Sequence, residues 1–194
     1  MESPLVRALR SVDGERLALH LATRDEYHRT FPLFFRAIAH EACARLWERF
    51  PDAAAFVGED CRREALARYP HLARLNLNWV AFAFRGLVMW DLHVGIVADL
   101  AQQPPVIHVG VHTTPPLWPR LGPMLEALDW QALVEEKLAL NDASVIGEIQ
   151  LIEPARPLPV TDLAGEVSRL ADRVVRYYEI VAPLPAAAGI VPRT

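Results

Sequence analysis

The chain has 194 residues, of which 52% are hydrophobic and 23% are charged, and its formal net charge is -4 at pH 7. This length and composition predict one globular domain with a sizeable core, and they exclude extensive disorder. The basic residues are spread along the chain without forming a block, so we expect no nucleic-acid partner.

Two further properties bear on the compartment. No run of 18 apolar residues occurs, and the N-terminus Met1–Pro4 lacks the charged and then apolar layout of a signal peptide. We therefore expect a cytosolic protein with no membrane partner. Cys43 and Cys61 form no CxxC pair, and the sequence favours reduced structural thiols over a disulfide.

The N-terminal part of the chain predicts mainly helix. Residues 1–28 are mixed in composition, with an alternating run at 16–21 that predicts an edge strand. Apolar residues at helical spacing predict a long buried helix from Thr30 to Pro51. A second helix is expected over 60–69, and it ends there because the residue before a proline avoids the helical region.

The middle of the chain predicts three strands. The first covers 79–84 and is followed by a tight turn at 85–86. The apolar runs 90–98 and 106–113 both alternate with the period of a strand. Because the loop 99–105 contains two prolines that end strand pairing, these two runs are predicted to form a hairpin.

Alternation divides the side chains of this hairpin between two faces. The apolar side chains point to the core, whereas Asp91, His93, His108 and His112 point the other way, with glycines between them that would leave space above the sheet. One register that satisfies this alternation places His93 opposite Gly110 and Asp91 opposite His112. His108 and His112 would then be diagonal neighbours of His93, roughly 7–8 Å away.

The next part of the chain predicts two helices and a strand. Helices are expected over 119–128 and 131–140, and an alternating strand over 144–153. If the odd positions of this strand face the core, Glu148 and Gln150 join the face that carries the histidines.

The C-terminal part predicts a last amphipathic helix that Thr161 caps. Its apolar stripe consists of Leu163, Val167, Leu170, Val174, Tyr177 and Val181. The Ala/Pro-rich tail 183–194 is expected to be flexible. Together, the elements predict one α+β domain over residues 1–182, with an antiparallel sheet and helices packed on its apolar face.

Several short motifs between residues 69 and 182 together resemble the YktB-like family of uncharacterised bacterial proteins. These motifs are Tyr69-Pro70-His71-Leu72-Ala73, Trp79–Ala83, the Arg85-Gly86 turn, His93, His108, Gly147–Leu151 and the closing helix. The resemblance implies a compact α+β domain with these histidines on one sheet face, and it implies no particular activity or cofactor. His112 has no clear counterpart in the pattern of the family.

The histidine face allows three chemical interpretations. The sequence predicts no metal site, because His108 and His112 lie about 13 Å apart along one strand and a site would need His93 between them, or Asp91 and Glu148 from neighbouring strands. A carboxylate beside an imidazole would suit general acid–base catalysis, although no nucleophile motif or phosphate-binding glycine motif occurs. In the third interpretation, the histidines only form hydrogen bonds within the domain.

We expect the protein to bind a small polar or anionic ligand on this face, with Arg85 as a charge partner and His71 at the rim; catalysis is compatible with this function, and no cofactor is identified. The alternative is a homodimeric interaction protein that uses the sheet face or the last helix. A monomer and a homodimer are both compatible with the sequence. The candidate ligand-binding residues are His71, Arg85, Asp91, His93, His108, His112, Glu148 and Gln150.

Overall fold

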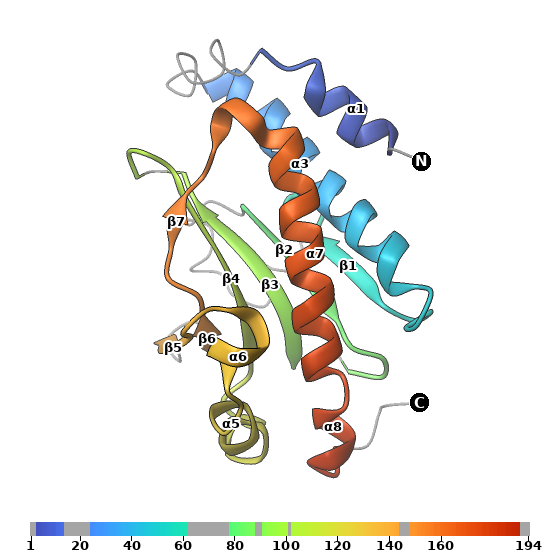
Figure 1. The fold of residues 1–194 in the computed structure, drawn as a ribbon, viewed down its shortest axis with the longest axis vertical. Helices are drawn as coiled ribbons and strands as arrows, with labels where there is room; N and C mark the ends of the chain where they lie inside the picture. Colours follow the sequence, from blue (N-terminus) through green and yellow to red (C-terminus); the bar gives the residue numbers. More distant parts are fainter. Residues whose placement is uncertain are drawn as a thin grey trace.

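In the part of the chain that the structure describes, seven strands form one sheet in which every hydrogen-bonded pair of strands is antiparallel (Figure 1). The computed structural model describes residues 3–13, 24–61, 78–87, 91–100, 102–143 and 148–190. The order of the strands is β1-β2-β3-β4-β6-β5, and β7 pairs with β4. The strands are β1 Ala54–Val57, β2 Trp79–Ala83, β3 Leu92–Asp99, β4 Val106–Thr113, β5 Ala139–Ala143, β6 Glu148–Ile152 and β7 Arg156–Pro157.

The two long helices, α3 and α7, pack against each other and cover one face of the sheet (Figure 1). Helix α3 contacts β1 and β2, helix α7 contacts β3 and β4, and α1 packs against both helices. No helix in the described part of the chain is long and apolar enough to cross a membrane. The helices are α1 Pro4–Arg10, α3 Arg24–Leu46, α5 Trp118–Glu126, α6 Trp130–Val134, α7 Leu163–Val181 and α8 Leu184–Ala187. The predicted α+β architecture, with helices on the apolar face of an antiparallel sheet, is therefore confirmed.

The core lies between the sheet and these helices. All six residues of the predicted apolar stripe of α7 are buried. The helix begins one residue after Asp162, which caps it by accepting a hydrogen bond from the backbone N–H of Gly165, so Thr161 is not the cap. From the sheet, Val94 and Ile96 of β3 and Val111 of β4 reach the same core.

The hairpin of β3 and β4 confirms the predicted alternation but not the predicted register. His93 lies opposite His112, and Gly95 lies opposite Gly110. The predicted pairing of His93 with Gly110 is therefore wrong by two residues. A shift of two residues leaves every side chain on its original face, so the alternation fixes the faces without fixing the partners.

Two predicted helices have different bounds in the structure. Helix α3 begins at Arg24 and continues through Thr30, because the burial of Phe31 and Phe34 outweighs the one backbone hydrogen bond that a proline removes. The predicted helix over 131–140 ends at Val134, since Glu135 adopts the left-handed conformation with φ of 62°.

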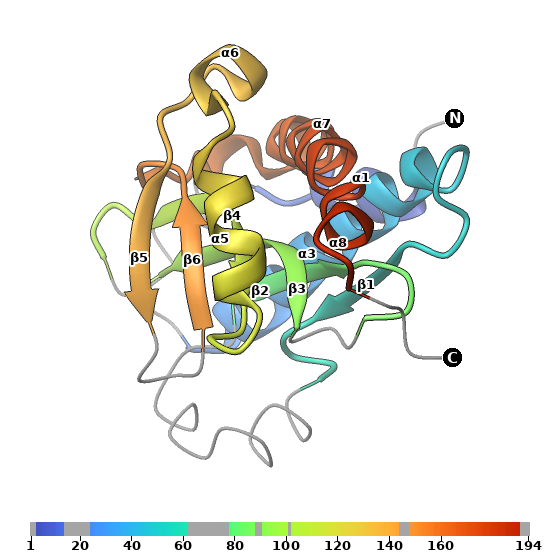
Figure 2. The same ribbon diagram turned by 90° about the horizontal axis from the view of Figure 1, so that it is seen from below.

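The strand β5 includes the last two residues of that predicted helix, 139 and 140, and continues to Ala143. It pairs with β6 and ends the sheet on this side, among the described residues. The sheet is strongly twisted, so that β5 and β6 run across the direction of β1 and β2 in Figure 2.

Other predicted elements fall on parts of the chain that the structure covers incompletely. The edge strand expected at 16–21 and residues 62–69 of the second predicted helix lie outside the described residues. In the tail that is expected to be flexible, α8 forms a short helix, and Leu184 and Ile190 are buried. Residues 191–194 lie outside the described part.

Candidate functional site

Three ligand-type side chains from three strands meet on the face of the sheet opposite to α7. His93 comes from β3, His112 from β4 and Glu148 from β6. One nitrogen of each imidazole and one carboxylate oxygen of Glu148 all lie within 4.8 Å of one another. The pairing of β4 with β6 produces this grouping. Gln150 lies opposite His112, and Glu148, two residues before Gln150, lies on the same face.

The two imidazoles are buried and stacked. The exposed fractions of His93 and His112 are 4% and 2%. Their ring centroids are 4.7 Å apart, and the ring planes are inclined by 19°. Nδ1 of His112 lies 3.2 Å from Oε2 of Glu148, at hydrogen-bond distance. One imidazole is thus oriented by a carboxylate, as the acid–base interpretation requires.

The carboxylate of Glu148 is held by a chain of polar side chains. Its Oε2 also accepts a hydrogen bond from Nε2 of Gln150 at 2.9 Å, and Oε1 of Gln150 accepts one from Nδ2 of Asn141 at 2.8 Å. Burial alone would raise the pKa of Glu148, but the hydrogen bond and charge of His112, the charge of His93 and the hydrogen bond of Gln150 lower this pKa to about 2. Glu148 is therefore a carboxylate at neutral pH.

This charge state fixes the position of one proton on His112. Because an ionised carboxylate only accepts hydrogen bonds, Nδ1 of His112 must be the donor to Glu148. In the neutral ring, the lone pair then lies on Nε2. This Nε2 is buried and has no hydrogen-bond partner among the described residues. The site therefore contains a buried ring nitrogen without a hydrogen-bond partner among the described residues.

The two glycines of the hairpin do not leave the open space above the sheet that the sequence predicts. The ring of His112 lies over Gly95, where an added Cβ would be 2.9 Å from Nε2. At Gly110, an added Cβ would be 2.6 Å from the backbone oxygen of Leu151. The space above one glycine is thus filled by the imidazole, and the space above the other by strand β6.

His108 lies on the same face but outside the group of three. It pairs with Val97, one residue of β4 separates it from Gly110, and it is partly exposed. Burial, and then the charge of His112, lower the pKa of His108 to about 4. This histidine is therefore neutral at neutral pH.

The structure does not bring the other predicted residues into this group. Asp91 precedes β3, and its backbone oxygen accepts a hydrogen bond from the hydroxyl of Thr113 at 2.8 Å. Arg85 forms an exposed ion pair with Asp52 at 3.1 Å, beside a separate, mainly apolar cavity of about 330 Å³. His71 lies outside the described residues. Asn141 was missed because it directly follows the helix predicted over 131–140, where no strand was expected.

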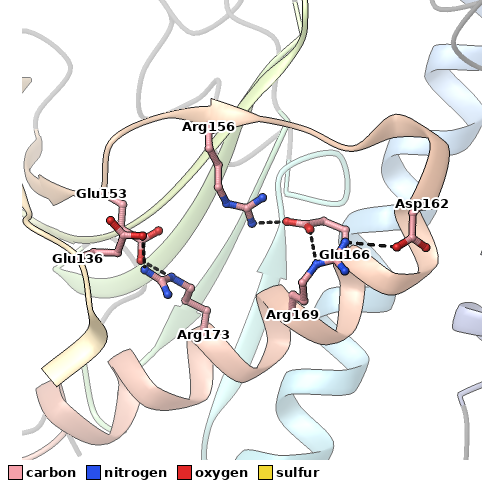
Figure 3. Close-up of polar contacts among 7 residues, drawn as sticks. All are labelled: Glu136, Glu153, Arg156, Asp162, Glu166, Arg169 and Arg173. Atoms are coloured by element: carbon pink, nitrogen blue, oxygen red, sulfur yellow. Dashed lines mark hydrogen bonds and ion pairs between the residues drawn. The ribbon is translucent and has the colours of Figure 1, made fainter.

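A second polar cluster lies along α7 (Figure 3). Glu166, which is completely buried, forms ion pairs with Arg156 of β7 and with Arg169, the latter at 2.9 Å. Arg169 also reaches Asp162 at 3.3 Å. The sequence carries a signal for this cluster, since Glu166 falls within the apolar stripe of α7, between Leu163 and Val167.

A second buried carboxylate, outside the helix, is bound by side chains of α7. Glu153, which follows β6, pairs with Arg173 and accepts a hydrogen bond from the hydroxyl of Tyr177 at 2.8 Å. Burial raises the pKa of Glu153, although these two partners oppose the shift. Arg173 also reaches Glu136 at 3.3 Å (Figure 3). Because both buried carboxylates are paired with arginines, this cluster is suited to attaching α7 to the sheet.

Comparison of the chain with models of protein families, with curated proteins and with solved structures finds no match. The resemblance to YktB-like proteins therefore stays a prediction. The inference of function rests on the geometry of the site.

Proposed function

We propose that this protein binds a small polar molecule at the group formed by His93, His112, Glu148 and Gln150, termed the histidine–glutamate site. The observation that supports this proposal is the buried Nε2 of His112, which has no hydrogen-bond partner in the described part of the chain. A buried polar atom without a partner costs about 1–3 kcal/mol. A bound molecule that donates a hydrogen bond to Nε2 would recover this free energy.

While the imidazoles of His93 and His112 are neutral, the charges around the site favour an uncharged or cationic molecule. Glu148 contributes a carboxylate, and Arg85, the charge partner expected for an anion, is paired with Asp52 elsewhere. An anion would therefore meet a negative charge with no described arginine to compensate it.

The site also has a capacity for proton transfer. Glu148 orients His112 through Nδ1, which leaves Nε2 free to accept a proton from a bound molecule. An imidazole held in this way by a carboxylate is suited to general base catalysis. Catalysis would then be a property of the same nitrogen that binds the molecule.

Thermal unfolding in the presence of EDTA tests this proposal. The protein is screened against neutral sugars, amino acids, polyamines and carboxylic acids, together with the variants His112→Gln and His108→Gln. We expect at least one uncharged or cationic compound to raise the Tm of the wild type and of His108→Gln, but not that of His112→Gln. Equal stabilisation of all three proteins, or stabilisation of none, would contradict the proposal.

A homodimer is the second candidate, and one observation favours a particular surface for it. Leu140 of β5 is 50% exposed, and β5 is the last strand of the sheet among the described residues. Exposed edge strands pair readily with a second chain. The apolar stripe of α7 is buried within one chain, which makes the β5 edge a better interface than the last helix.

Light scattering after size-exclusion chromatography tests the homodimer. A dimer of the wild type that dissociates in the variant Leu140→Lys would support this second function. A wild-type protein that stays monomeric at high concentration would contradict it.

A further inference from the structure

We propose that the histidine–glutamate site holds a divalent transition-metal ion, with the imidazoles of His93 and His112 and the carboxylate of Glu148 as its protein ligands. This inference rests on the proposed function, because it names an occupant of the same site. The polar molecule would then bind beside the ion, at positions that the protein leaves open.

The three groups are clustered closely enough to share one ion. Their ligand atoms lie within 4.8 Å of one another although they come from three strands. Metal bonds to imidazole nitrogen and to carboxylate oxygen are about 2.0–2.2 Å long, which places neighbouring ligands of one tetrahedral ion about 3.3–3.6 Å apart. Nδ1 of His112 and Oε2 of Glu148 are already 3.2 Å apart.

An ion at this position would displace a proton. An ion between Nδ1 of His112 and Oε2 of Glu148 would take the place of the proton that these atoms now share, and the neutral ring would then carry this proton on Nε2. The ligand nitrogen of His93 lies within 4.8 Å of the other two ligand atoms and would have to move closer to reach bonding distance. Nε2 of His112 would remain over Gly95 as an N–H donor.

The chemical nature of the ligands suits a transition-metal ion. Two imidazoles and one carboxylate suit borderline ions such as Zn²⁺ and Fe²⁺, whereas Mg²⁺ and Ca²⁺ prefer oxygen ligands. Three protein ligands also leave open coordination positions, as catalytic zinc sites and two-histidine, one-carboxylate iron sites do. The buried carboxylate would meanwhile gain a cation next to it.

The experiment uses the full chain, treated with EDTA and then dialysed to remove the chelator. Zn²⁺ binding is measured by calorimetry, and Co²⁺ binding by its visible absorption. The wild type is compared with His93→Gln and Glu148→Gln, and with His108→Gln as the matched control, since His108 lies on the same face of β4 but outside the group. Circular dichroism verifies that each variant is folded.

We expect the wild type and His108→Gln to bind one equivalent of metal, and the two site variants to bind at least about tenfold more weakly. If His93→Gln fails to fold, Glu148→Gln decides the outcome, because glutamine preserves the shape of the side chain. The inference is overturned if the wild type binds neither ion, if the folded site variants bind as tightly as the wild type, or if His108→Gln loses as much affinity as they do.

These measurements contain no organic molecule, and the screen of the proposed function contains EDTA. A compound that stabilises the protein while neither ion binds would overturn the metal site alone. Metal binding without any stabilising compound would overturn the small-molecule proposal alone.

Discussion

His93 and His112 face each other across β3 and β4, with ring centroids 4.7 Å apart. This pairing depends on the register of the hairpin, because a shift of two residues would place His93 against Gly110 and separate the rings. Glu148 joins the pair only because β6 lies on the other side of β4. The candidate site is therefore a product of three strands, and each of its groups can be removed separately.

The first prediction concerns acid stability through Glu148. Its pKa is about 2 in the folded protein, against an ordinary value of 4.5. A lowered pKa stabilises the fold above pH 4.5, and this stability is lost as the pH falls towards 2. In metal-free protein, we expect Glu148→Gln to remove about 2–3 kcal/mol of this pH dependence. Urea unfolding at several pH values measures it, and identical pH dependence in both proteins would refute it.

The second prediction concerns His108 and a different pH range. Its pKa is lowered from 6.5 to about 4, so the folded protein resists protonation that the unfolded chain accepts. Stability from this group is complete above pH 6.5 and is lost as the pH falls to about 4. His108→Gln should make the free energy of unfolding less dependent on pH in that range. An unchanged dependence of the unfolding free energy on pH between these values would contradict the lowered pKa of His108.

The third prediction separates the two glycines of the hairpin. An alanine at Gly95 would meet the ring of His112, a side chain that can tilt, whereas an alanine at Gly110 would meet the backbone of Leu151. We expect Gly95→Ala to leave the Tm nearly unchanged but to weaken Zn²⁺ binding. Gly110→Ala should lower the Tm substantially, because the pairing of β4 with β6 must open.

Calorimetry and thermal unfolding of the two glycine variants provide the measurements. Equal losses of Tm in both would contradict the assignment of Gly95 to the site and of Gly110 to the sheet.

The fourth prediction concerns the buried ion pairs of Glu166. Removal of both cationic partners in Arg156→Ala/Arg169→Ala leaves a buried carboxylate unpaired and should cost about 3–5 kcal/mol. The same double change made in a Glu166→Gln background should cost less, because no buried charge remains. Denaturant unfolding of the four proteins measures this difference.

A surface ion pair provides the control for this cycle. Arg49 pairs with Glu179 and is largely exposed, so Arg49→Ala should cost within about 1 kcal/mol. If Arg49→Ala lowers the free energy of unfolding as much as the double change does, the burial of Glu166 does not make its ion pairs more important for stability.

The sequence predicts the faces of the strands well, for a physical reason. Side chains alternate strictly along a strand, so the apolar residues Val94, Val109 and Val111 place His93 and His112 on the other face. Register is different, because shifts of two residues preserve both faces. The choice between registers depends on the geometry of the connecting loop, which the alternation of side chains does not contain.

The limits of local patterns are also visible at β5 and α7. Residues 131–140 have helical spacing, but Glu135 ends the helix and the chain turns into β5, which brings Asn141 to Gln150. In α7, the buried position of Glu166 was readable from its place in the apolar stripe. Its partner Arg156 was not, because the two residues meet only through the path of β7.

The protonation of His112 tests the account most directly. Nitrogen-15 NMR of the histidine side chains distinguishes the two ring nitrogens in metal-free protein at mildly alkaline pH. We predict a proton on Nδ1, shared with Glu148, and an unprotonated Nε2. A proton found on Nε2, with Nδ1 unprotonated, would contradict the hydrogen bond to Glu148 and the free nitrogen on which the proposed binding site depends.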